Sequence, residues 1–175
     1  MCRNVKLRIT RHGFTMIELL IVVAILAIAA AIAVPMASST GSMQLRAAVT
    51  MVAADLEYAK SMSISRGQRY AVLFDKTTET YRIADESGTT ISHPIKKGFF
   101  YTVDFRNDGR LSQVDIVDAN FDGAAAVSFD YLGSPYKGTG GAAPPLNSGV
   151  ITLRAGGQTR TVSVVPVTGF ISVSN

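Results

Sequence analysis

One ionisable side chain, Glu18, lies near the start of a long run of apolar residues. The 16 residues from Leu19 to Val34 are all apolar. A carboxylate placed at the centre of a bilayer costs on the order of 2.5 kcal/mol or more, and such a group usually has a partner and a function. The pattern therefore indicates that the carboxylate of Glu18 has a partner, which the apolar run itself does not supply.

A second group of oxygen-bearing side chains has the spacing of a metal site. Asp118, Asn120 and Asp122 precede Gly123 and match the first half of a calcium-binding loop. Phe129 stands where that loop requires a bidentate Glu, so we favour an Asx turn between strands, with calcium binding as the alternative. The sequence contains no nucleophile motif for which His93 could act as the base, and we interpret His93 as a surface histidine. We expect no enzyme activity, no catalytic residue and no cofactor.

The apolar run is long enough to cross a membrane. Residues 14–37 are interrupted only by Thr15, Glu18 and Pro35, and as a helix they would span roughly 36 Å, against a hydrocarbon core of roughly 30 Å. A basic segment without acids precedes the run and is expected to stay on the cytoplasmic side. Its charged residues are Arg3, Lys6, Arg8 and Arg11.

Two simpler interpretations of this N-terminus explain less. A secretory signal peptide needs small residues before its cleavage site, and cleavage after Ala37 would place Pro35 among them. A plain membrane anchor accounts for the length of the run. Neither interpretation explains why Glu18 is there.

Residues 13–20, Gly-Phe-Thr-Met-Ile-Glu-Leu-Leu, resemble the class III leader of type IV prepilins and type II secretion pseudopilins. The resemblance implies that a prepilin peptidase/methyltransferase cuts between Gly13 and Phe14 and methylates the new amine of Phe14. Glu18 then becomes the fifth mature residue and Pro35 the twenty-second, and both are assembly residues. In this family the carboxylate meets the N-terminal amine of a neighbouring subunit, which removes two unpaired charges from an apolar filament core.

The charge balance supports this topology rather than a nucleic-acid partner. The formal net charge is +4, but four of the 17 Lys and Arg lie in residues 1–13, and the remaining 13 match the 13 acids. We therefore expect no nucleic-acid partner. The only cysteine, Cys2, also leaves with the leader, so the mature chain can form no disulfide.

The rest of the chain indicates an α+β fold, in which a long N-terminal helix, its first half transmembrane, packs on an antiparallel β-sheet domain. We expect a leader at 1–13, a transmembrane half-helix at 14–37, an amphipathic half-helix at 38–66 and a β-rich domain at 67–175. Residues 38–42 form either a flexible joint or the surface exit of the helix, and the Gly- and Pro-rich residues 133–149 an exposed loop. Strands are expected at 69–74, 80–84, 99–106, 111–117, 126–131, 150–154, 159–165 and 170–173.

Further segments resemble the GspH/FimT group of minor pilins and pseudopilins. They are residues 55–69, 129–135, 149–153 and 165–169. Lys60 stands for the usual Arg of that group and Ser63 for its usual Ala. The resemblance implies a type IV pilin-like fold and a subunit near the tip of a periplasmic pseudopilus for type II secretion.

The alternative within this group is a FimT-like type IV pilus minor pilin acting in pilus assembly or DNA uptake. The chain carries no positive charge after Arg160, whereas a polyanion requires clustered Lys and Arg. The implied partners are other pilins or pseudopilins through the N-terminal helix, the prepilin peptidase/methyltransferase and an inner-membrane assembly platform. The implied location is the bacterial inner membrane, single-pass with a periplasmic domain, and then the filament.

Overall fold

One helix, α1 (Met16–Arg66), accounts for the first part of the fold. The computed structural model describes residues 14–174, apart from the side chains of residues 32–39. The helix runs through Pro35 without a break. Its last turn carries Arg66, and Gly67 ends it with a φ of 63°, a left-handed conformation that glycine adopts without steric cost. The helix predicted for residues 14–66 is therefore confirmed to within two residues.

The chain divides into two compact units, Met1–Ala37 and Ser38–Asn175. Among the residues described, the structure contains no helix long and apolar enough to span a membrane. The predicted span at 14–37 includes side chains outside that description, and it stays a prediction.

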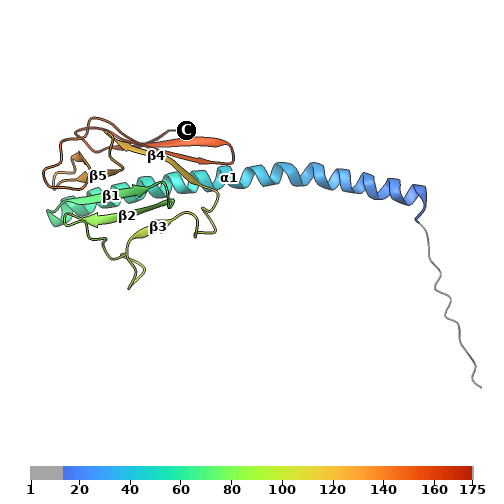
Figure 1. The fold of residues 1–175 in the computed structure, drawn as a ribbon, viewed down its shortest axis with the longest axis horizontal. Helices are drawn as coiled ribbons and strands as arrows, with labels where there is room; N and C mark the ends of the chain where they lie inside the picture. The colour runs from blue at the N-terminus through green and yellow to red at the C-terminus, as the bar shows by residue number, and fades with distance from the viewer. Residues whose placement is uncertain (1–13, 175) are drawn as a thin grey trace, which may run out of the picture. The chain divides into compact units, whose positions relative to one another are not determined.

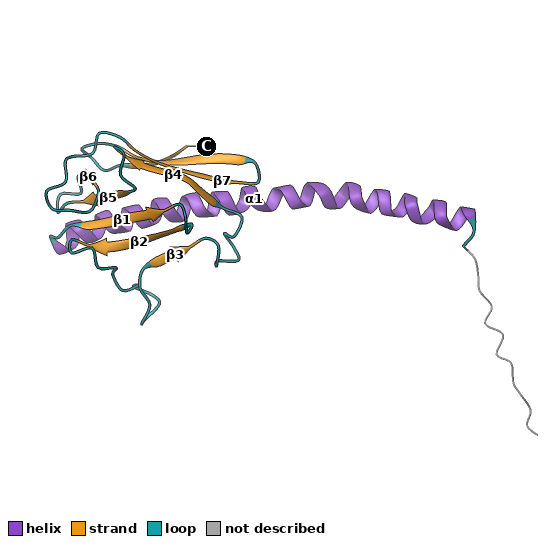
Figure 2. Cartoon of the chain, viewed as in Figure 1, coloured by secondary structure: helices purple, strands orange, loops and turns teal. Residues whose placement is uncertain are grey.

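The second unit contains two antiparallel sheets that share the helix (Figures 1 and 2). The first has the order β3-β2-β1-β5-β6 and the second the order β4-β7-β8-β9. The strands of the first are β1 (Tyr70–Asp75), β2 (Thr80–Asp85), β3 (Thr102–Asp104), β5 (Ala126–Phe129) and β6 (Pro135–Lys137). Those of the second are β4 (Asp115–Phe121), β7 (Gly149–Ala155), β8 (Gln158–Val164) and β9 (Ile171–Ser174).

A single core joins the second half of α1 to both sheets. The helix contributes side chains at spacings of three and four, as the amphipathic pattern predicts. These are Leu45, Val49, Val52, Leu56 and Ala59, all buried. Each sheet adds its own buried side chains, for example Ile83 and Phe129 from the first and Ile151 and Val162 from the second. The predicted α+β class, a long helix on antiparallel sheet, is confirmed.

The structure corrects several sequence-based boundaries. The strand predicted at 99–106 is reduced to β3, and the strand predicted at 111–117 begins four residues later, at Asp115. Leu111 and Val114 are buried, as strand residues would be, but they lie in the turn and the connecting residue that precede β4. The segment 133–149 is not simply an exposed loop, because it contains β6 and buries Leu146.

Residues 38–42 are helical, and Gly41 is buried against the turn between β7 and β8. A Cβ added at Gly41 would lie 2.8 Å from both the Cα and the N of Gly156. Backbone atoms cannot move away as a flexible side chain can. The glycine that weakens the helix pattern is therefore the residue that lets the helix touch the hairpin.

We expect Gly41→Ala to lower the melting temperature of the purified chain. Alanine favours a helix over glycine by about 1 kcal/mol, but overpacking typically costs about 1–3 kcal/mol, and the contacts at Gly41 are with backbone. Gly109→Ala is the control, because that position faces open space and has no positive φ. A melting temperature that rises in Gly41→Ala would show that the helix and hairpin are not in close contact.

Candidate assembly site

The N-terminus of α1 carries a reciprocal pair of hydrogen bonds between Thr15 and Glu18. The Thr15 N–H donates to Glu18 Oε2 over 3.5 Å, and the Glu18 N–H donates to Thr15 Oγ1 over 3.2 Å. This is a capping box, in which the side chains at the N-cap and at the third helical position satisfy each other's backbone donors. The spacing Thr-x-x-Glu is visible in the sequence, and our sequence analysis missed it.

The capping box defines where the carboxylate of Glu18 lies. Phe14 directly precedes Thr15, so the amine released by cleavage after Gly13 would be one residue from the capped end of the helix. Gly13 and the rest of the predicted leader, Cys2 included, lie outside the described residues. Pro35 is described only as helical backbone. The geometry thus places Glu18, but not the cleavage site, at the helix terminus.

The apolar surface of the first unit has no cover from the described part of the chain. All side chains from Phe14 to Ala31 are exposed. A helix that is apolar on all sides is normally buried in a large core or in a membrane, and a large exposed apolar surface marks an interaction site. This segment therefore requires an external apolar environment.

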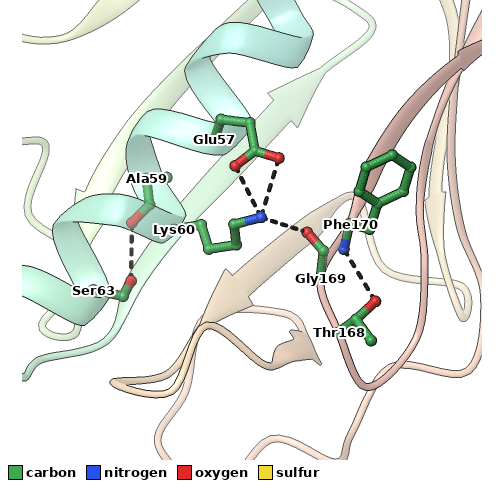
Figure 3. A network of polar contacts seen from close by, with 7 residues as sticks. All are labelled: Glu57, Ala59, Lys60, Ser63, Thr168, Gly169 and Phe170. Atoms are coloured by element: carbon green, nitrogen blue, oxygen red, sulfur yellow. Dashed lines mark hydrogen bonds and ion pairs between the residues drawn. The ribbon is translucent and has the colours of Figure 1, made fainter.

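Lys60 links the C-terminal part of α1 to the loop between β8 and β9 through a hydrogen bond (Figure 3). Its ammonium group forms an ion pair of 2.8 Å with Glu57 Oε2 and donates to the Gly169 carbonyl oxygen over 3.0 Å. Ser63 is buried one turn later, where its hydroxyl donates to the Ala59 carbonyl and accepts from the Tyr70 N–H. The two positions that depart from the GspH/FimT pattern thus hold the helix to both sheets.

Two further segments that resemble the GspH/FimT group, 129–135 and 165–169, meet at the same end of the helix. The Asp130 carboxylate accepts from the N–H groups of Leu132 and Ser134, which closes the loop 130–134. Gly169 packs on this loop, because a Cβ there would clash with the Gly133 carbonyl oxygen. The conformation of Gly169, with a φ of 59°, also favours glycine. The segments 129–135 and 165–169 therefore have a packing role.

A buried carboxylate, Asp55, joins the helix to the first sheet. Tyr81 and Tyr101 donate their hydroxyl hydrogens to Asp55 over 2.5 and 2.8 Å. Burial raises the pKa of Asp55, and the two hydrogen bonds oppose that rise. Burial and the neighbouring carboxylate raise the pKa of both tyrosines. His93 stacks on Tyr101 with ring centroids 4.7 Å apart, so it is part of this cluster rather than a plain surface residue.

The three residues of the predicted calcium loop have separate structural roles. Asp118 and Asn120 lie in β4, not in a loop. Asp118 Oδ1 lies 3.7 Å from Lys76 Nζ, and the Asn120 side chain caps a tight turn. The Asp122 carboxylate accepts from the N–H groups of Asn147 and Ser148. Within residues 14–174 no group of three or more His, Cys, Asp or Glu could hold a metal. The expectation of no cofactor, with calcium as the alternative, stays a prediction.

The first comparison with known proteins concerns the N-terminus. Residues 8–34 match the model of the prokaryotic N-terminal methylation motif. This match covers the residues that carry the leader resemblance, including Glu18. No curated protein matches the chain.

Solved structures match the fold. The minor pseudopilin EpsH from the Type 2 Secretion System of Vibrio cholerae superposes with a TM-score of 0.53 at 11% identity, over 75% of this chain and 96% of that one. A second EpsH structure gives 0.52 at 11% identity, over 74% and 92%.

The type IV minor pilin FimU of Pseudomonas aeruginosa gives a TM-score of 0.50 at 18% identity, over 75% of this chain and 88% of that one. The chain has a type IV pilin-like fold. In this fold the methylation motif and the two-sheet domain are joined by one continuous helix, α1.

Proposed function

We propose that this chain is a minor pseudopilin or minor pilin subunit that assembles, near the tip, into a periplasmic pseudopilus for type II protein secretion. The observation that carries the proposal is the methylation motif at 8–34, which continues through α1 into a pilin-like domain. The chain is then a structural subunit rather than an enzyme. Its partners are other pilins or pseudopilins, the prepilin peptidase/methyltransferase and an inner-membrane assembly platform.

The exposed apolar helix suits two successive locations of the subunit, first the membrane and then the filament. Before assembly, residues 14–37 lie in the inner membrane in a single pass, with the domain on the periplasmic side. During assembly the helices of neighbouring subunits replace lipid around the same apolar surface. The carboxylate of Glu18 then meets the amine of an adjacent subunit, which supplies the opposite charge that a desolvated carboxylate needs.

The N-terminus of the native protein tests this proposal. We expect intact-mass spectrometry of the full chain, coexpressed with a prepilin peptidase, to show a mature protein that starts at methylated Phe14. The same chain without the peptidase should retain Met1 and the leader. Retention of Met1 in the presence of the peptidase, or a start at Ser38, would contradict a pilin-like role.

A further inference from the structure

The connection between β2 and β3 contains a projecting loop, residues 93–99 (Figures 1 and 2). Its base is closed by a backbone hydrogen bond, in which the His93 N–H donates to the Phe99 carbonyl over 2.8 Å. The loop and the residue after it expose three large apolar side chains and two lysines. These are Ile95, Phe99, Phe100, Lys96 and Lys97. Because none of the five is buried, the conformation of the loop depends on its hydrogen bonds.

The imidazole of His93 closes the outer part of this loop. Its Nδ1 atom accepts from the N–H groups of Ile95 and Lys96, both over 3.1 Å. A ring nitrogen accepts a hydrogen bond only while it carries no proton, so this arrangement requires the neutral imidazole with its hydrogen on Nε2. The conformation of the loop therefore depends on the charge of one side chain.

The turn between β1 and β2 has the same arrangement with a carboxylate as its cap. There Asp75 Oδ1 accepts from the N–H groups of Thr77 and Thr78 over 2.8 and 3.3 Å, again two and three residues farther along the chain. These hydrogen bonds lower the pKa of Asp75, so the carboxylate stays an acceptor well into acid. A histidine changes its charge between about pH 5 and 8. The cap at His93 is therefore lost in a pH range where the cap at Asp75 is kept.

The groups around His93 favour an imidazolium that stays in place. The ring stacks on Tyr101 at 4.7 Å with 12° between the planes, and the face of an aromatic ring attracts a cation. Tyr58 of α1 stacks on the same tyrosine. The Asp55 carboxylate of α1 is close enough to interact with a charge on His93. The two lysines of the loop carry the same charge as the imidazolium, so protonation favours separation of the loop from the ring.

We infer that His93 is a pH-sensitive cap: the neutral imidazole holds residues 94–98 in place, and protonation releases them while the imidazolium stays on Tyr101. The inference goes beyond the proposed function and does not depend on it, because every contact involved lies within the folded domain. Release in acid changes how Ile95 and the two lysines are presented. This surface of the domain thereby responds to the pH of its surroundings.

Nitrogen-15 NMR of the full chain in detergent tests the inference. Between about pH 7.5 and about pH 5.5, we expect the Nδ1 signal of His93 to change from that of an unprotonated acceptor to that of an imidazolium. Over the same range the protection of the Ile95 and Lys96 N–H groups against hydrogen exchange, corrected for the intrinsic rate, should fall about tenfold. The N–H of Thr77 should keep its protection, so the turn at Asp75 is an internal control.

Two variants separate the acceptor from the ring. His93→Asn places an amide oxygen where Nδ1 lies, and asparagine accepts from backbone groups two residues on without titrating. Its loop should stay protected over the whole pH range. His93→Phe keeps a ring that can stack on Tyr101 but has no acceptor, so its loop should show at the higher pH the low protection of the wild type in acid. If either variant does not fold, the titration of the wild type still decides.

Three outcomes would overturn the inference. They are a charge on His93 that does not change over this pH range, a change of charge without a change in the protection of Ile95 and Lys96, and a loss of protection in His93→Asn equal to that of the wild type. The last outcome would assign the pH dependence to another group, such as Asp55. None of these measurements depends on leader removal or filament assembly, so the proposed function stands or fails separately.

Discussion

Substitution of Glu18 by glutamine should leave leader removal intact and reduce incorporation into filaments at least about a hundredfold. Removing one partner of a buried ion pair typically costs about 3–5 kcal/mol, because the other charge stays buried and unpaired. Glutamine has the size of glutamate and also completes a capping box, so the helix terminus stays closed. The measurement is the ratio of variant to wild-type subunit in purified filaments, with processing followed by mass.

Thr15→Ala is the matched control for this variant. It removes the hydroxyl that accepts from the Glu18 N–H and keeps the carboxylate. We expect a loss of about 1 kcal/mol in helix stability and near-normal incorporation. If Glu18→Gln assembles as the wild type does, or if Thr15→Ala fails equally, capping rather than charge pairing explains Glu18.

The second large effect concerns the buried carboxylate Asp55. Tyr81→Phe should lower the free energy of unfolding by about 2–3 kcal/mol at pH 7, because it removes one of two donors to a buried acceptor that carries charge. The measurement is urea unfolding of the purified chain. Tyr58→Phe is the control, because Tyr58 stacks on Tyr101 through its ring and should tolerate loss of its hydroxyl.

Asp55→Asn keeps the shape of the side chain and removes its titrating group. Comparing the free energies of unfolding of the wild type and this variant at several pH values therefore isolates the effect of the charge. Burial raises the pKa of Asp55 in the folded state, so the folded chain binds this proton more tightly than the unfolded chain does. The stability contributed by this group therefore increases as the pH falls toward the unfolded pKa, and it is lost as the pH rises through the folded one. Between pH 7 and about pH 4, the free energy of unfolding of the wild type should therefore increase relative to that of Asp55→Asn.

Aspartates in the turns have the opposite effect on the pH dependence of stability, and the comparison between wild type and Asp55→Asn removes their contribution. Hydrogen bonds to turn groups lower the pKa of four carboxyls, which lose stabilising charge in acid. These are Asp75, Asp85, Asp104 and Asp108. They are identical in wild type and Asp55→Asn, so they cancel. A stability difference that does not change with pH would show that Asp55 is not a buried, titrating group.

Local patterns sufficed for most of the secondary structure. The period of the apolar residues from Leu45 to Ala59 places one helix face in the core, and each hairpin turn follows from its own Gly, Asp or Asn residues. The motif around Glu18 likewise lies within a few residues of sequence. In such cases the deciding interactions join residues three or four apart, or alternate along one strand, and a single sequence contains them.

Other features depend on segments far apart in the chain. The start of β4 depends on pairing with β7, and the short strand β6 exists because β5 lies beside it. Asp55 meets Tyr81 and Tyr101 across separations of 26 and 46 residues, and Lys60 meets Gly169 across 109. No local period encodes such contacts. The sequence alone therefore indicated an apolar N-terminal helix followed by a β-rich domain, whereas long-range packing decided where the strands pair and which carboxylate is buried.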